Sequence, residues 1–191
     1  MNSVPNVGGA LRAANHPIPT PRPGSDLRHS HSLRTYRRYD GPGCWFVTKC
    51  LQPRRPLLDS QAAERVADAL KWYAAQGDIC AGAFVIMPDH WHLLFHTGPC
   101  GQVKTFMRKA CHWISRETRD SLVLKNGAWQ DGYHDTRVRS VRQFRFIRHY
   151  IEENPVRKGL TATPEEWLWS TASPRYGDVP PLNWPYEFEE E

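Results

Sequence analysis

The sequence predicts an α+β domain, an antiparallel β-sheet with helices packed on one face. First, short apolar runs typical of strands alternate with longer runs whose apolar residues recur at helical spacing. Second, two of the strand-like runs are joined by the turn dipeptide Pro88-Asp89, which predicts a hairpin. In order, the elements are β-α-β-β-α-β-α, which is typical of a ferredoxin-like or RRM-like domain.

The first half of the domain supplies three of the strands. Residues 44–50 alternate between apolar and other side chains, as a half-buried strand does. Residues 60–75 predict a helix, with apolar positions at Ala63, Val66, Leu70 and Tyr73. The apolar run 79–87 and the run 90–96 lie on either side of Pro88-Asp89 and form the predicted hairpin.

The second half supplies two helices and one strand. Residues 102–119 predict an amphipathic helix, with its apolar stripe at Val103, Phe106, Ala110, Trp113 and Ile114. Residues 133–139 predict the last strand. Ser140 then opens a third helix, because Ser140 followed by Gln143 has the spacing of a capping box. Pro155 is expected to end that helix, since proline disrupts a helix interior.

The chain divides into one domain and two tails. Its 191 residues, 40% of them apolar, are enough for one domain with a sizeable core. Residues 1–35 are rich in Pro, Gly, Ser and Arg without periodicity, and predict a disordered basic tail. Residues 36–178 form the predicted domain. Residues 179–191 form an acidic C-terminal tail.

Charge and cysteine content favour a cytoplasmic protein. The net charge of +5 suits a polyanionic partner such as nucleic acid, although an ordinary basic protein would also have it. The five cysteines form no CxxC pair, and no stretch resembles a signal peptide. The longest apolar run, 79–87, is far shorter than the ~20 residues that span a bilayer. We therefore expect a cytoplasmic, nucleoid-associated protein that does not enter membranes.

Two histidines in the second hairpin strand form a candidate metal site. In a strand, residues at i and i+2 share a face, so His90 and His92 would lie side by side while Trp91 points the other way. Two such imidazoles can hold one divalent metal. Alternatively, they are surface residues, or they form a three-histidine zinc site with His96, which continues the same face.

A tyrosine and an asparagine form the second candidate feature. On a helix, Tyr150 and Asn154 are one turn apart and face the same way. They lie beside an apolar stripe, expected to pack on the sheet, of Phe144, Ile147 and Ile151. A phenol and an amide would thus sit together at the sheet surface. The alternative is a half-buried tyrosine, with Asn154 ending the helix.

Together these features resemble the HUH endonucleases, and in particular the REP-associated tyrosine transposases of bacteria. That family has a Pro-x-His-x-His strand and a Tyr-x-x-x-Asn-Pro-Val helix end, and both occur here in order. Three further stretches resemble family motifs, namely Tyr36-Arg37-Arg38 with Gly43 before Trp45-Phe46-Val47-Thr48, Trp129-Gln130-Asp131-Gly132-Tyr133, and Trp167-Leu168-Trp169-Ser170. The resemblance covers residues 36–170. It departs at Asp135-Thr136, where relatives usually carry Asp-His.

The resemblance implies a metal-dependent enzyme that nicks and joins single-stranded DNA at REP-type hairpins. Tyr150 would be the nucleophile and would form a 5'-phosphotyrosine, leaving a free 3'-hydroxyl. His90 and His92, with Asn154, would hold Mg²⁺ or Mn²⁺, which acts as a Lewis acid on the phosphate. Because the covalent link preserves the energy of the phosphodiester, joining would need no nucleotide cofactor.

Basic residues predict the DNA contacts. Arginines recur along the last helix, and further cations flank it, so we expect a backbone-binding patch near Tyr150. The patch comprises Arg137, Arg139, Arg142, Arg145, Arg148, Arg157 and Lys158. By resemblance, Tyr36, Arg37 and Arg38 would help to recognise the sequence beside the hairpin. The alternative is a solvated basic face.

Two rival functions remain open, and we expect a monomer in each case. One is a nucleic-acid-binding protein of the same fold that has lost cleavage, which Thr136 would favour if the missing histidine assists proton transfer or DNA binding. The other is a small zinc hydrolase that uses His90, His92 and His96, with Tyr150 incidental.

Overall fold

The structure is a computed structural model that describes residues 41–54, 57–98, 101–119 and 127–176. The predicted tails at 1–35 and 179–191 lie outside the described residues. Tyr36, Arg37 and Arg38 also lie outside them. Within the described parts of the chain, no helix is both long enough and apolar enough to cross a bilayer.

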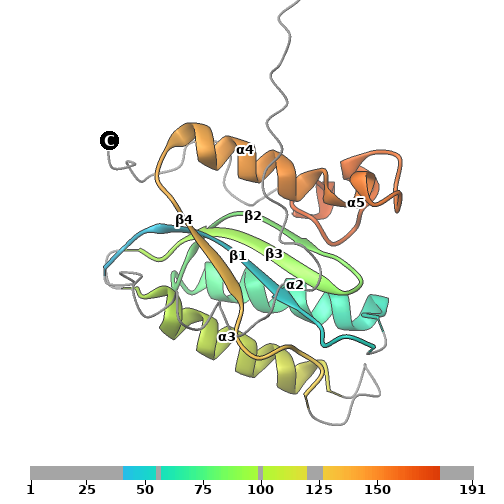
Figure 1. The fold of residues 1–191 in the computed structure, drawn as a ribbon, viewed down its shortest axis with the longest axis horizontal. Coiled ribbons are helices and arrows are strands. Elements are labelled where there is room, and N and C mark those ends of the chain that lie inside the picture. Colours follow the sequence, from blue (N-terminus) through green and yellow to red (C-terminus); the bar gives the residue numbers. More distant parts are fainter. Residues whose placement is uncertain (1–40, 55–56, 99–100, 120–126, 177–191) are drawn as a thin grey trace, which may run out of the picture. The chain divides into compact units, whose positions relative to one another are not determined.

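Four strands form one antiparallel sheet. They are β1 (Cys44–Cys50), β2 (Cys80–Ile86), β3 (His90–His96) and β4 (His134–Val138). Their order in the sheet is β2-β3-β1-β4, and each neighbouring pair is antiparallel (Figure 1). Since the helices connect β1 to β2 and β3 to β4, this is the split βαβ arrangement of a ferredoxin-like domain. The predicted α+β class is confirmed.

Two helices cover one face of the sheet and enclose the larger core. Helix α2 (Ser60–Ala75) and helix α3 (Val103–Glu117) lie side by side below the sheet in Figure 1. Helix α2 begins at the N-cap Asp59, whose carboxylate accepts a hydrogen bond from the backbone N–H of Ala62 at 2.7 Å. The residues that β3 contributes to this core are Trp91, Leu93 and Phe95.

The third helix packs on the opposite face of the sheet. Helix α4 (Val141–Glu152) buries its apolar stripe against β2 and β3, forming a second core (Figure 1). The residues of that core include Ala83, Val85, Leu94, Phe144, Ile147 and Ile151. The expectation of helices on one face was therefore wrong for α4. The reason is that β2 and β3 carry apolar side chains on both faces, so both faces need cover.

Helix α4 starts at the predicted residue. The Ser140 hydroxyl accepts a hydrogen bond from the backbone N–H of Gln143 at 3.2 Å, as in a capping box. The Gln143 side chain reaches one residue further back than in the usual box, and accepts from the backbone N–H of Arg139 at 2.9 Å. These two bonds fix the turn between β4 and α4.

The chain does not leave the helical conformation at Pro155. Helix α4 ends at Glu152, and a short helix, α5 (Asn154–Arg157), follows directly, with Pro155 in its first turn. A proline is tolerated there because N–H groups in the first turn of a helix have no helical partner. Asn154 is therefore the first residue of a new helical turn, a fixed position close behind α4.

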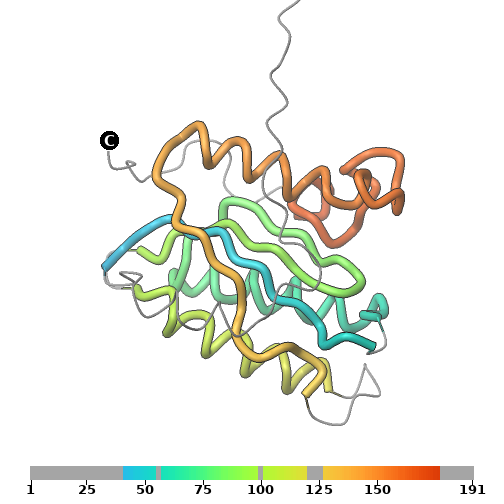
Figure 2. The backbone as a smooth tube through the Cα atoms, viewed as in Figure 1, coloured from blue at the N-terminus to red at the C-terminus, as the bar shows by residue number. Residues whose placement is uncertain are grey.

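The segment after α5 returns to the free edge of β2. The backbone N–H of Ile86 donates to the carbonyl of Trp169 at 2.8 Å, and the indole N–H of Trp167 donates to the carbonyl of Ile86 at 2.9 Å. Figure 2 shows the end of the described chain, in red, turning back toward β2. This segment protects backbone groups that would otherwise be exposed at the sheet edge.

Candidate active site

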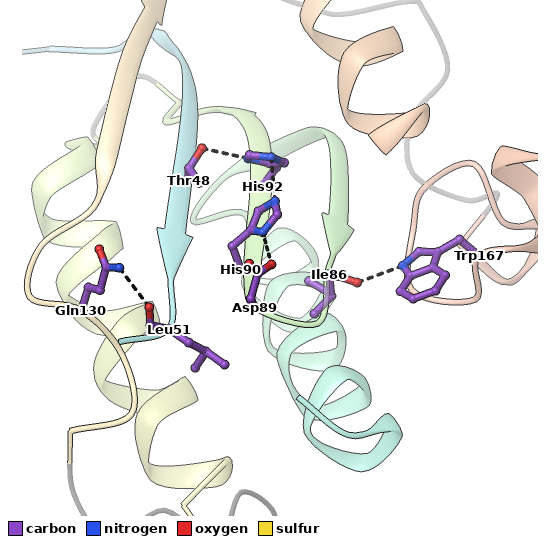
Figure 3. A network of polar contacts seen from close by, with 8 residues as sticks. All are labelled: Thr48, Leu51, Ile86, Asp89, His90, His92, Gln130 and Trp167. Carbon is purple, nitrogen blue, oxygen red and sulfur yellow. Dashed lines mark hydrogen bonds and ion pairs between the residues drawn. The ribbon is translucent and has the colours of Figure 1, made fainter. Parts of the chain in front are cut away.

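The two predicted histidines lie side by side on the face of β3 that α4 covers. Their Nε2 atoms are 3.1 Å apart, and their ring centroids are 4.6 Å apart (Figure 3). Trp91, between them in sequence, is fully buried in the core on the other face. The shared strand face predicted for His90 and His92 is thus confirmed.

Each imidazole is held through its Nδ1 atom. The Asp89 carboxylate lies 2.6 Å from Nδ1 of His90, and the Thr48 hydroxyl lies 2.8 Å from Nδ1 of His92 (Figure 3). With both Nδ1 atoms engaged, the two Nε2 atoms are the ones left to bind a ligand, and they converge. Sequence reasoning missed both partners. Asp89 adjoins the motif, whereas Thr48 is found only through strand pairing.

The electrostatics favour a neutral imidazole at His92. Burial lowers the pKa of His92 well below its usual value, and the neighbouring His90 lowers it further. A neutral ring has the free lone pair that a metal ligand needs. Conversely, the hydrogen bond from His90 lowers the pKa of Asp89, and the positive charge of Lys158 adds to this. The Asp89 carboxylate is therefore ionised while it holds His90.

Tyr150 meets this pair from the opposite layer. It lies near the end of α4, and its ring centroid is 5.5 Å from that of His92. The ring of Phe46, on β1, meets the Tyr150 ring edge to face, with 6.1 Å between the two ring centroids. The guanidinium of Arg157, on α5, lies 5.2 Å from the centre of the phenol ring. The fold therefore brings a phenol, two imidazoles and a cation together.

Asn154 is buried with an unsatisfied oxygen. Its side chain is 4% exposed, and its Oδ1 atom has no hydrogen-bond partner among the described residues. A buried amide oxygen without a partner is costly and calls for an explanation. A metal ion held by this oxygen and the two ring nitrogens would supply one.

The two ring nitrogens are close enough to share one divalent metal ion. Two ligand atoms at about 2.1 Å from a metal are about 3.0 to 3.4 Å apart, depending on the coordination geometry. The Nε2 atoms are 3.1 Å apart, within this range.

The three histidines of the alternative zinc site do not lie together. His96 lies at the other end of β3 from His90, roughly 20 Å along the strand at the usual rise per residue. Its Nδ1 accepts a hydrogen bond from the backbone N–H of Gly98 at 2.9 Å. Among the described residues, no group of three or more His, Cys, Asp or Glu side chains is placed to hold a metal. The interpretation as a three-histidine zinc site is therefore wrong.

The predicted basic patch assembles only in part. Arg157 and Lys158 lie at the site, since one contacts Tyr150 and the other acts on the Asp89 carboxylate. Arg148 instead forms an ion pair with Glu152, one turn later, at 3.0 Å. The exposed residues Arg139, Arg142 and Arg145 lie at the start of α4 and along it.

Arg137 lies on the other face of the sheet. Strand pairing sets it opposite Trp45, and its guanidinium is 6.0 Å from the centre of that indole ring. Trp45 belongs to the core beneath α2 and α3, so the predicted placement of Arg137 near Tyr150 was wrong. The cause is the two-residue alternation of β4, which turns its odd-numbered positions away from the site. Whether Arg137 or the other cations contact DNA stays a prediction.

Two exposed residues of β4 lie on the same face of the sheet as His90 and His92. Thr136 pairs with Phe46, and His134 pairs with Thr48, which itself holds His92. The position where relatives carry histidine is thus occupied by an exposed threonine, while an imidazole stands two residues earlier on the same face. Sequence reasoning missed His134, although the alternation of the strand carries the signal.

The chain belongs to the IS200-like transposase family. The model of the family described as "Transposase IS200 like" matches residues 46–154, which is more than half of the chain and includes both histidines, Tyr150 and Asn154. The chain is 29% identical over 142 residues to the REP-associated tyrosine transposase of Escherichia coli K12. That alignment covers 73% of this chain and 82% of the relative.

A solved structure has the same fold. It is described as the REP-associated tyrosine transposase bound to a REP hairpin. The TM-score is 0.61 at 21% identity, with 81% of this chain and 92% of the other covered. The ferredoxin-like arrangement of the sheet and helices is thus shared with a protein that binds hairpin DNA.

Proposed function

We propose that this chain is a metal-dependent enzyme that nicks and joins single-stranded DNA at REP-type hairpins. The observation that carries the proposal is the meeting of Tyr150 with the His90–His92 pair. The rings of Tyr150 and His92 are 5.5 Å apart, and the imidazoles converge at 3.1 Å. Membership of the IS200-like transposase family supports the same reading.

The proposed reaction is a transesterification at one phosphodiester. The Tyr150 oxygen attacks phosphorus and forms a bond to it, while the bond from phosphorus to the 3'-oxygen breaks. The phenol proton leaves to solvent, and the 3'-oxygen takes one up, so a 5'-phosphotyrosine and a 3'-hydroxyl result. The positive charge of Arg157 beside the phenol ring stabilises the negative charge that develops there. The reverse step joins another 3'-hydroxyl.

The proposed metal ligands are His90, His92 and Asn154. When bound, Mg²⁺ or Mn²⁺ would act as a Lewis acid on a non-bridging phosphate oxygen. Asp89 and Thr48 keep the two imidazoles oriented, so that little rearrangement is needed on binding. A bound metal would give the buried Asn154 oxygen the partner that it lacks among the described residues.

The proposed substrate class rests on the relatives. One relative is named for its association with REP sequences, and the solved structure holds a REP hairpin. Cations at the site and along α4 provide contacts for a phosphate backbone, and those near the site are Arg157 and Lys158. Tyr36, Arg37 and Arg38 remain predicted contacts to the flanking sequence.

The test is covalent capture of DNA. The protein is incubated with Mn²⁺ and a labelled single-stranded hairpin from the flanks of its own gene, and adducts are resolved by denaturing electrophoresis. We expect an adduct for the wild type and for the control Tyr133→Phe. Tyr150→Phe should form none while binding the hairpin within a few-fold, because only the attacking oxygen is removed. An undiminished adduct in Tyr150→Phe would refute the proposal.

A DNA-binding protein without cleavage is the second candidate. It is favoured by Thr136, which replaces the histidine that relatives usually carry. Wild-type protein that binds the hairpin but forms no adduct at any Mn²⁺ or Mg²⁺ concentration would support this candidate. His134 on the same strand face is a reason to expect activity instead, since it keeps an imidazole on this side of the sheet.

A further inference from the structure

Helix α4 carries an exposed aromatic residue one turn before Tyr150. The buried side of the helix is formed by Phe144, Ile147 and Ile151, while Phe146 is 50% exposed. Residues four apart are neighbours on a helix surface, so Phe146 and Tyr150 lie on the same flank. Single exposed hydrophobic residues are common, and the exposure alone means little. Phe146 differs from an ordinary exposed hydrophobic residue in the charge of its neighbours.

The surroundings of Phe146 are cationic. Arg142 lies one turn before Phe146 on the same line of the helix, and both residues are exposed. Arg145 is exposed as well, but it directly precedes Phe146 and therefore points about 100° away around the helix. Within the described parts of the chain, neither arginine has an ion pair, in contrast to Arg148, which pairs with Glu152. A phenylalanine beside an arginine that is free to pair with a phosphate is the combination found where proteins hold single-stranded nucleic acid.

The neighbouring half of the sheet has exposed residues on the site face. Helix α4 packs on β2 and β3, whereas the site face of β4 exposes His134 and Thr136. The Tyr150 ring reaches Phe46 on β1, so its flank of the helix faces the half of the sheet formed by β1 and β4. A DNA strand whose phosphate reaches Tyr150 therefore passes close to Phe146.

We propose that Phe146 stacks on an unpaired base of the DNA strand, with Arg142, one turn earlier on the same line of the helix, on a neighbouring phosphate. This inference rests on the proposed function, whose site it extends. Side chains four apart on a helix are about 6 Å from one another, so the stacked base lies within about two nucleotides of the scissile phosphate. A second copy of the chain is disfavoured as occupant, because its own arginines would be repelled.

The test uses fluorescence of 2-aminopurine, which stacking on an aromatic ring quenches. Hairpins with a single-stranded flank carry the probe at successive flank positions, and binding is measured in EDTA so that no cleavage occurs. We expect quenching at one or two adjacent positions. Phe146→Ala should abolish it and weaken the Kd about tenfold, whereas Phe146→Trp should keep both. The matched control is Trp72→Ala on α2, which removes an aromatic that is 55% exposed beyond the other sheet face.

Further outcomes separate this inference from the proposed function. Wild-type quenching and affinity in Phe146→Ala would overturn the inference, and an adduct in the same protein would leave the proposed cleavage intact. Quenching that depends on Phe146, without any adduct, would support stacking and refute cleavage. If Phe146→Ala instead alters the sedimentation of the free protein, the residue belongs to an interface between copies, and the inference is wrong.

Discussion

Thr48 and His92 lie directly opposite each other on β1 and β3, with the threonine hydroxyl 2.8 Å from Nδ1 of the imidazole. The hydroxyl fixes the rotation of a buried ring whose other nitrogen, Nε2, faces His90 at 3.1 Å. A residue far away in the sequence therefore orients the proposed metal ligand.

Replacing Thr48 with valine should loosen His92 without changing the fold, since the two side chains have nearly the same shape. Loss of such an outer hydrogen bond commonly weakens metal affinity roughly tenfold or more. We expect the Mn²⁺ concentration for half-maximal adduct formation to rise by about this factor, with most of the rate restored at saturating metal. The control is Thr136→Val on β4, an exposed position of the same face. An equal shift in both variants would contradict an orienting role for Thr48.

Removing either histidine should abolish cleavage at every metal concentration. His90→Ala and His92→Ala each delete one of the two converging nitrogens. The wild type should lose adduct formation in EDTA and regain it with Mn²⁺ or Mg²⁺. His149→Ala, an exposed histidine on the same helix as Tyr150, should behave as the wild type. Full activity after exhaustive chelation would disprove a role for metal.

Replacing Asn154 with alanine should raise the Mn²⁺ midpoint for adduct formation, because one ligand is lost. Its side-chain oxygen has no hydrogen-bond partner in the part of the chain that the structure describes, so its removal should change metal-free stability by less than about 1 kcal/mol. Asn154→Asp retains an oxygen at the same place and should restore binding. A lower Tm in Asn154→Ala, with an unaltered metal midpoint, would assign the residue a structural role only.

His96 should make the fold sensitive to acid. Burial, with a contribution from Arg137, lowers the pKa of His96 to about 4. The unfolded chain takes up this proton below about pH 6.5, whereas the folded chain does not. Stability is therefore present in full above about pH 6.5 and falls as the pH approaches 4. We expect the free energy of unfolding, measured in urea, to fall between pH 7 and pH 4.5 by roughly 2 kcal/mol more in the wild type than in His96→Gln. An equal loss of unfolding free energy in the two proteins would argue against this role of His96.

Local periodicity was enough to predict much of the site. The two-residue repeat of a strand set His90 and His92 on one face, and the helical repeat set Phe144, Ile147 and Ile151 on the buried side of α4. Both repeats depend only on neighbouring residues. For the same reason, the bounds of β3 and α2 were predicted as the structure has them, and Ser140 was identified as the start of α4.

The tertiary structure alone decided which residues meet across elements. Thr48 reaches His92 because β1 pairs with β3 in one register, and Arg137 turns away because β4 pairs with β1 in another. The sequence did not reveal that α4 covers the second face, which brings Tyr150 to the histidines and leaves Phe146 exposed. Strand register and layer packing are set by the burial of side chains far apart in the chain, and no local pattern encodes them.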